Sequence, residues 1–278
     1  MQYKNKLSDY EVVHPTKDAR KKKEYWQTAI GLNQVDGLEP SDYLLETAKR
    51  NIEGELPDEQ VSKAITSYYT SIGNTEEEWK KTKECDLVSI RIKELLEQNM
   101  FTFSPEMLKG IHKYLFSDIY PDIAGKFREC NIRKAEPILN GDTVKYANFF
   151  MIEDLFRYDF QEEESKSYHM PIQEKELKSL AKFTSSIWQV HPFMEGNTRA
   201  IAVFIELYLN SKGYQVNNEP FQACARYFRN ALVRSNYTNV KHQIQPDFRY
   251  LELFYENLLL DQKHELREEE LDCSRNMN

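Results

Sequence analysis

Residues 190–199 read Val-His-Pro-Phe-Met-Glu-Gly-Asn-Thr-Arg, and apolar helical patterns flank them on both sides. The segments 174–189 and 200–211 repeat apolar residues at the three- and four-residue spacing of a buried helix face. Those residues are Leu177, Leu180, Phe183 and Ile187 before the stretch, and Ile201, Phe204, Leu207 and Tyr208 after it. The pattern predicts two core helices joined by a short turn that carries a histidine, an acid, a glycine–asparagine pair and an arginine.

The second half of this stretch has the composition of a phosphate site. A loop that runs into a helix N-terminus presents unpaired backbone amides and a partial positive charge, and the two together bind phosphate. Gly196 lets the backbone approach an anion closely. Asn197 and Thr198 add side-chain donors, and Arg199 adds a fixed charge suited to phosphate oxygens.

The first half supplies a base and a metal ligand. Glu195 has the wrong sign for phosphate, but beside a phosphate it can hold a bridging Mg²⁺. His191 titrates near neutrality and can take a proton from an incoming hydroxyl. A histidine next to Pro-Phe is by itself more often a packed core residue, and only its combination with the anion site favours a base. The stretch therefore indicates attack of a hydroxyl on a nucleotide phosphate.

The bulk composition narrows the class of protein. The chain has 278 residues, enough for one large domain or two modest ones. It contains no run of about 18 apolar residues, so no membrane span is expected. Four cysteines without metal-ligand spacing, and an N-terminus without the apolar core of a signal peptide, favour a cytoplasmic location. The net charge of −8 argues against nucleic acid as the main partner, and the basic run over residues 17–23 is best explained as a solvated helix face.

Nine glycines and a low β-branched content favour an all-α fold. Apolar periodicity and capping residues such as Ser41 and Ser104 predict further helices. These cover residues 16–32, 42–52, 58–69, 79–98, 105–115, 149–168, 222–235 and 248–270. One β-hairpin is expected over residues 138–146, where Asn140-Gly141 is a strong turn signal.

A polar stretch over residues 71–78 predicts a linker between two parts of the chain. The expected division is a small helical N-terminal module, residues 1–72, and a main domain, residues 73–278. The main domain has its core over about 80–240 and a C-terminal helix over 248–270.

The pattern His-Pro-Phe-x-x-Gly-Asn-x-Arg, starting at His191, resembles the active-site motif of the Fic family. The resemblance extends upstream to Leu-Lys-Gly-Ile-His-Lys-Tyr-Leu-Phe at residues 108–116 and to Ala-Gly-Lys-Phe-Arg at residues 124–128. It covers roughly residues 80–240. It implies the Fic helical bundle with a hairpin flap, and transfer of AMP from ATP, with Mg²⁺, to a hydroxyl of a target protein.

The resemblance also implies roles for individual residues. His191 would be the base, and Glu195 would bind Mg²⁺. The target would pair with a flap that includes Val144, Lys145 and Tyr146. Residues implied to contact the nucleotide are Phe193, Gly196, Asn197, Thr198, Arg199 and Asn236.

Two features concern regulation. The full AMP-transferring motif of the family has a second arginine, which holds the γ-phosphate of ATP, where this chain has Ala202. The segment around Glu53-Gly54 resembles the inhibitory helix of small Fic antitoxins, which places a glutamate in the nucleotide site; Lys49 stands where that helix has Ser or Thr. The resemblance therefore implies a toxin–antitoxin-like arrangement in one chain, with Glu53 as the inhibitor. The alternative is an exposed Glu53 paired with Lys49 one helical turn back.

Three hypotheses follow from the sequence. The first is an autoinhibited adenylyltransferase that modifies a Tyr, Ser or Thr hydroxyl. The second is transfer of another phosphate-containing group, or removal of AMP, because Ala202 replaces the arginine. The third is a nucleotide-binding or protein-binding module with little turnover. The sequence leaves the target and any homo-oligomer undetermined.

Overall fold

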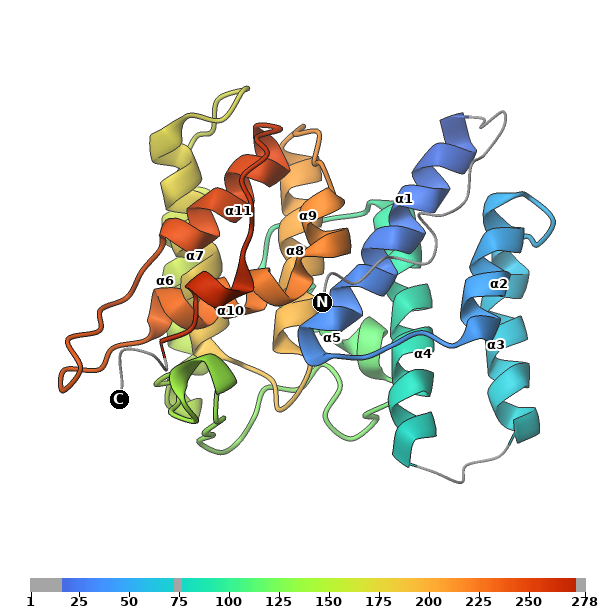
Figure 1. Ribbon diagram of the computed structural model, residues 1–278, viewed down its shortest axis with the longest axis horizontal. Coiled ribbons are helices and arrows are strands. Elements are labelled where there is room, and N and C mark those ends of the chain that lie inside the picture. The colour runs from blue at the N-terminus through green and yellow to red at the C-terminus, as the bar shows by residue number, and fades with distance from the viewer. Residues whose placement is uncertain (1–16, 73–76, 274–278) are drawn as a thin grey trace. The chain divides into compact units, whose positions relative to one another are not determined.

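The computed structural model describes residues 17–72 and 77–273, which are mainly helical (Figure 1). In this part of the chain the only β pairing is an isolated bridge between Asn239 and Ile244. The chain divides into two compact units. The first comprises residues 1–100 with 221–225, and the second comprises residues 101–220 with 226–278.

The first unit packs four main helices around a common core. They are α1 (Lys17–Leu32), α2 (Asp42–Ile52), α3 (Asp58–Ile72) and α4 (Glu77–Gln98), and the short η2 (Asn33–Asp36) follows α1. The core includes Trp26, Ile30, Leu44, Ala48, Ile52, Val61, Ile65 and Ile90. Ser41 caps α2 as predicted, because its hydroxyl accepts the Leu44 N–H at 2.9 Å.

Helix α4 belongs to this first unit, which therefore extends to Met100 and not only to the expected boundary at residue 72. Buried polar contacts hold the helix there. The side-chain amide of Asn33 donates to the Ser89 hydroxyl at 3.0 Å. Asp86, also on α4, accepts from the backbone N–H of Ser41 at 2.9 Å and from the Tyr69 hydroxyl at 2.7 Å. Of the expected linker at 71–78, residues 73–76 lie outside the described residues, and the others belong to the ends of α3 and α4.

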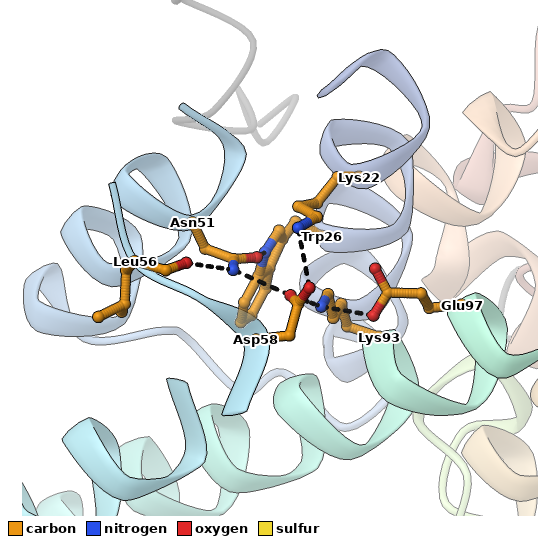
Figure 2. A network of polar contacts seen from close by, with 7 residues as sticks. All are labelled: Lys22, Trp26, Asn51, Leu56, Asp58, Lys93 and Glu97. Carbon is orange, nitrogen blue, oxygen red and sulfur yellow. Dashed lines mark hydrogen bonds and ion pairs between the residues drawn. The ribbon is translucent and has the colours of Figure 1, made fainter. Parts of the chain in front are cut away.

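A polar network joins the four helices of this unit (Figure 2). The Asp58 carboxylate, at the start of α3, accepts from the Lys22 ammonium at 3.0 Å, from the Asn51 amide at 2.9 Å and from Lys93. Lys93 is 1 % exposed and also contacts Glu97 at 2.7 Å. Burial alone would raise the pKa of Asp58, but its three donors outweigh burial and lower the pKa to about 2.

The same network closes the turn between α2 and α3, which carries Glu53. The Asn51 amide donates to the Leu56 carbonyl at 2.8 Å and accepts from the Trp26 indole N–H at 2.9 Å. The Leu56 N–H in turn donates to the Arg50 carbonyl at 3.1 Å. Glu53 is the exposed C-cap of α2.

Replacing Asp58 with asparagine is expected to lower the free energy of unfolding by about 1–2 kcal/mol at pH 7, because the buried Lys93 keeps only Glu97 as partner. The effect stays below that of a fully buried pair, since the Asp58 side chain is 42 % exposed. Urea unfolding measures it. The control is Asp154→Asn, whose pair with Arg157 is exposed and should change stability by less than about 0.5 kcal/mol.

The pH dependence follows from the sign of the Asp58 shift. A carboxyl whose pKa is lowered from 3.8 to about 2 on folding stabilises the protein above pH 3.8 and loses that effect as pH falls towards 2. The stability difference between wild type and Asp58→Asn should therefore narrow below about pH 4. A difference that grows on acidification contradicts this assignment.

The second unit is built around α8 (Asn197–Ser211), in which every residue from Asn197 to Leu209 is buried. A helix that is buried on all sides is a core helix. Helices α5 (Pro105–Phe116) and α7 (Glu174–Val190) pack on it, and α6 (Ile152–Glu164) and α11 (Arg249–Leu259) pack on α7. The remaining elements are η3 (Pro137–Leu139), η4 (Phe149–Met151), α10 (Ala225–Asn236) and η5 (Glu268–Glu270). The short α9 (Glu219–Ala223) is divided between the units, since residues 221–225 belong to the first.

Two C-terminal helices are shorter than expected. The segment 222–235 is divided into α9 and α10 at Cys224. The predicted helix 248–270 ends at Leu259, and Asp261 takes the left-handed conformation with φ of 50°. The chain after this point folds back, because the Asn257 amide group exchanges hydrogen bonds with the backbone N–H and carbonyl of His264, both at 2.9 Å.

The expected hairpin forms its turn without paired strands. Asn140 and Gly141 have φ of 54° and 81°, as a two-residue hairpin turn requires, and the Glu136 N–H donates to the Asp142 carbonyl at 2.8 Å. Pro137 starts the 3₁₀-helix η3 and has no N–H to donate to a ladder. The Ile138 carbonyl accepts from the Cys273 N–H at 2.8 Å. No strand is assigned to residues 127–146.

The helices and the cysteines bear on two further expectations. None of the described helices is long and apolar enough to cross a membrane. The four cysteines are free thiols.

Candidate active site

The loop between α7 and α8 is bounded by two left-handed residues. Helix α7 ends at Val190, and His191 is its C-cap with φ of 47°. Gly196, with φ of 73°, is the N-cap of α8. A left-handed conformation is uncommon for histidine, and the bond from the His191 N–H to the Trp188 carbonyl, at 3.0 Å, holds it. These two reversals take the chain from the end of α7 to the start of α8 within six residues.

The His191 ring is buried and neutral. Its side chain lies under the Tyr146 ring, with centroids 4.2 Å apart, and its Nδ1 is 3.3 Å from the Trp188 carbonyl. A carbonyl only accepts, so the contact favours the proton on Nδ1 and leaves the lone pair on Nε2. Burial, together with the positive charge of Lys134, lowers the pKa of His191 to about 3. The ring is thus unprotonated at Nε2 at neutral pH.

Arg128 holds the histidine loop and the turn segment together. Its Nε donates to the His191 carbonyl at 2.8 Å, and its other nitrogens donate to the carbonyls of Cys130, Val190 and Ala147. Its backbone N–H donates to the Pro192 carbonyl at 2.8 Å. Arg128 is 3 % exposed, and one planar guanidinium fixes four carbonyls from three segments.

His112, on α5, supports the loop from below. Its Nδ1 accepts from the Gly125 N–H at 2.9 Å, so Nε2 carries the proton and donates to the Glu195 carbonyl at 2.9 Å. Burial lowers the pKa of His112 to about 4, which keeps the ring neutral. The ring also stacks on Phe193, with centroids 3.7 Å apart. Phe193 is fully buried and is therefore a packing residue of the loop.

Gly196 is required for steric reasons as well as for its backbone conformation. A Cβ at this position would lie 2.4 Å from two atoms of the Phe116 ring. Because glycine has no side chain, it cannot cap the first-turn N–H groups of α8, which is how a helix N-terminus remains available to an anion.

The motif side chains after Gly196 point in different directions. The Asn197 amide turns back to Phe193, accepting its N–H at 2.9 Å and donating to its carbonyl at 2.8 Å. Asn197 thus holds the loop, whereas the sequence predicted a phosphate donor. The Thr198 hydroxyl accepts from the Trp188 indole at 3.0 Å, which leaves its own proton to donate. The buried Arg199 guanidinium lies over the Phe116 ring at 4.8 Å.

Glu195 is exposed on this loop. Mg²⁺ in nucleotide sites takes one or two carboxylates and completes its coordination with phosphate oxygens and water. One carboxylate beside a helix N-terminus fits that donor set. In the part of the chain that the structure describes, no three His, Cys, Asp or Glu side chains form a metal-binding cluster. The residues present therefore fit a nucleotide-bound Mg²⁺ and not an all-protein site.

The expected flap residues lie beside the histidine. Val144 is buried, and the Lys145 carbonyl accepts from the Gln189 amide of α7 at 3.2 Å. Tyr146 covers His191 and donates to the buried Glu136 carboxylate at 3.4 Å. Burial and the nearby carboxylate raise the pKa of Tyr146. The segment expected to form the flap thus lies against His191 and lacks paired strands, and its role towards a target stays a prediction.

A buried ion pair fixes the base of this segment. The Arg229 guanidinium, from α10, contacts both Glu136 carboxylate oxygens, at 2.8 Å and 3.0 Å. The Tyr237 hydroxyl donates to Asp142 at 2.8 Å on the other side of the turn. Sequence reasoning gave no role to Arg128, His112 or this pair, since their partners are far away in the chain. Arg128 and His112 lie inside the segments that resemble the Fic family, which was the available signal.

Three further positions named from the sequence lie outside the loop itself. The Asn236 amide donates to the Ser185 hydroxyl at 2.9 Å and to the Leu232 carbonyl, so it joins α10 to α7. Ala202 is fully buried on α8. Glu53 is in the first unit, where it is the exposed C-cap of α2.

Comparison with known proteins shows the family of the segment that contains this loop. The sequence model of the Fic/DOC family matches residues 102–209. The N-terminal Fic domain of an effector protein (Bep) from Bartonella sp. AR 15-3 has a TM-score of 0.52 and 16 % identity, over 67 % of this chain and 84 % of that chain. The N-terminal FIC domain of Bep8 from Bartonella sp. 1-1C has a TM-score of 0.51 and 15 % identity, over 68 % and 88 %. Among curated proteins, no sequence matches this chain.

At these identities the two structures show a shared fold and no more. The matched segment contains α5, Arg128 with the carbonyls that it bonds, the expected flap and the whole loop from His191 to Arg199. Residues 102–209 of this chain are therefore a Fic/DOC family domain.

Proposed function

We propose that this protein transfers AMP from ATP to a Tyr, Ser or Thr hydroxyl of a target protein. Fic/DOC domains are known for AMPylation and nucleotidyl transfer in general. The observation that carries the proposal is the buried, neutral His191, with its Nε2 lone pair, directly before a glycine-capped helix N-terminus.

The chemistry assigns one task to each group. The target hydroxyl gives its proton to His191 Nε2 while its oxygen attacks the α-phosphorus of ATP. The bond between the α-phosphorus and the bridging oxygen breaks, and pyrophosphate leaves. The N–H groups at the start of α8 and the Arg199 guanidinium hold the phosphate oxygens. When bound by Glu195 and the phosphates, Mg²⁺ supplies positive charge against the charge that develops on pyrophosphate.

The flap offers a place for the target chain. In the part of the chain that the structure describes, the backbone N–H groups of Lys145 and Tyr146 make no hydrogen bond. An extended target segment can pair with such an edge, as in other complexes that form by strand addition. This pairing would place its hydroxyl next to His191.

The pH dependence of transfer tests the state of the base. A general base must be unprotonated, and with a pKa lowered to about 3 His191 is unprotonated throughout the range from about pH 5 to pH 8. We expect kcat/KM for labelling to show no acid limb in that range, because kcat/KM reports the free enzyme. A loss of kcat/KM with a midpoint near 6.5, the ordinary pKa of histidine, contradicts this state.

We propose that Glu53 restrains ATP binding, as the sequence of its helix implies. Support comes from its exposed position on a turn that the Asn51 and Asp58 contacts hold in one conformation. Glu53→Gly should raise ATP affinity and labelling, and Glu55→Gly, on the same turn, is the matched control. Equal labelling by wild type and Glu53→Gly removes this part of the proposal.

The transfer itself is tested by incubating the full chain and a cell extract with Mg²⁺ and ATP labelled in adenine. We expect labelled protein bands that disappear with His191→Ala. If no protein carries a label that depends on His191, either with the wild-type chain or with the Glu53→Gly variant, the proposal is wrong.

Ala202 favours a second candidate, transfer of another phosphate-containing group or removal of AMP, because the position that would grip the γ-phosphate has no cation. Competition among unlabelled nucleotides and incubation with a pre-modified target separate these reactions from AMP transfer. A biological activity that survives His191→Ala would instead favour a binding module.

A further inference from the structure

Exposed apolar side chains gather beside the catalytic loop. Of the exposed large apolar residues in the second unit, Phe149, Phe150 and Met151 are consecutive, at 39 %, 68 % and 40 % exposure. Met194, inside the motif loop, is 41 % exposed. An exposed cluster of this kind on a soluble protein usually marks an interaction site.

Contacts join these residues into one surface. The Phe149 N–H donates to the Asn131 side chain at 3.0 Å. The neighbouring Cys130 is exposed, and its sulfur lies 3.9 Å from the Met194 sulfur. These contacts place Phe149 next to Asn131 and Cys130 next to Met194, and we call the group Phe149–Met151, Cys130 and Met194 the apolar ledge.

The ledge is fixed relative to the base. One guanidinium, that of Arg128, bonds the carbonyls of His191, Cys130 and Ala147. Cys130 is in the ledge, and Ala147 is two residues before Phe149. A chain that lies along Lys145 and Tyr146 and continues in the direction of residue 149 would reach the ledge.

We propose that the ledge binds apolar side chains of the protein substrate, next to the hydroxyl that is modified; this rests on the proposed function. The occupant is an extended segment of the target, because the ledge is continuous with the flap edge and the catalytic loop. Phe149 is three residues beyond Tyr146, so the apolar residue lies about three to five residues from the modified one, on one side.

The test uses synthetic peptides with a central Tyr and either Phe/Leu or Ser three to five residues away on each side in turn. Binding of fluorescent peptides to the full-length His191→Ala chain measures docking without transfer. Labelling of the same peptides by the wild-type chain with ATP and Mg²⁺ measures transfer.

The apolar peptides should bind and be labelled about tenfold better than the Ser peptides, equivalent to about 1.4 kcal/mol. Phe150→Ser should remove this preference and retain the lower, His191-dependent labelling of the Ser peptides. The control Met170→Ser should keep the preference. Met170 is 63 % exposed and lies near Gly213, at the end of α8 opposite the motif, about 20 Å along the helix.

The outcomes separate the two proposals. His191-dependent labelling that is equal for apolar and Ser peptides overturns the ledge and leaves the transfer intact. Preferential binding without His191-dependent label on any peptide or extract protein overturns the transfer, and not the ledge.

Sedimentation of the wild-type chain and of Phe150→Ser tests whether a second copy of the chain occupies the ledge. A dimer that Phe150→Ser dissociates, with no change in peptide preference, also overturns the proposal.

Discussion

Replacing Gly196 with alanine is expected to reduce AMP transfer at least about 100-fold, because the loop must move by an ångström or more to accept a side chain. The new Cβ would lie 2.4 Å from two Phe116 ring atoms. That ring cannot move easily, since it packs against His112 and under Arg199. Its displacement would shift the arginine that is proposed to hold phosphate. Labelled-ATP transfer by the purified full chain measures the loss.

The free energy of unfolding of Gly196→Ala should fall as well. Left-handed strain costs about 1–2 kcal/mol for an alanine, and overpacking costs about 1–3 kcal/mol more. Gly37→Ala is the matched control, because Gly37 has φ of 67° and nothing within 4 Å of a Cβ. It isolates the strain and should leave labelling unchanged. If Gly196→Ala and Gly37→Ala lose the same free energy of unfolding, the steric part of this account is wrong.

Replacing Arg128 with lysine is expected to reduce transfer about 100-fold, since misplacement of the histidine by about an ångström has an effect of this size. Lysine keeps the charge but has no planar fork, so it cannot reach the carbonyls of His191, Cys130, Val190 and Ala147 together. Each buried carbonyl left without a donor costs about 1–3 kcal/mol. The unfolding free energy should therefore fall with the activity.

Arg133→Lys is the control for Arg128→Lys. Arg133 is also in the segment before the flap, but its side chain is 78 % exposed. Its ion pair with Asp142 is long, at 3.7 Å. Its replacement should leave labelling and stability unchanged. Equal losses in the two variants would mean that the bonds from Arg128 to the four carbonyls are not what transfer depends on.

The helices that the sequence predicted well are those whose pattern is local. The apolar spacing around the motif predicted α7 and α8, and the hydroxyl of Ser41 predicted the start of α2, because these signals depend on neighbours within a turn or two. The end of α11 was not predictable in this way. Its end is followed by a reversal that depends on Asn257 bonding a residue seven positions later.

Within the candidate active site, the motif predicted the loop between α7 and α8 but not the contacts of each side chain. Asn197 has the chemistry of a phosphate donor, but it serves the backbone of Phe193, and spacing alone cannot distinguish the two. The contact between His112 and Glu195 spans 83 residues, and that between Arg229 and Glu136 spans 93. Such contacts are decided by tertiary packing.

The position of Ala202 changes how its role can be tested. From the sequence, Ala202→Arg is an obvious way to restore a γ-phosphate contact. Because Ala202 is fully buried, this variant would place a long charged side chain in the packed core around α8, and a loss of folding would mask any gain in ATP affinity. Competition among nucleotides on the unaltered chain avoids that difficulty.

The most direct test of the central claim is the fate of each part of ATP. The full chain is incubated with extract proteins and ATP labelled either in the α-phosphate or in the γ-phosphate, and His191→Ala is run alongside. We predict that the α-phosphate label enters protein with wild type only, that the γ-phosphate label leaves as pyrophosphate, and that neither label enters protein with His191→Ala. Incorporation of the γ-phosphate label, or equal α-phosphate labelling by His191→Ala, contradicts AMP transfer with His191 as the base.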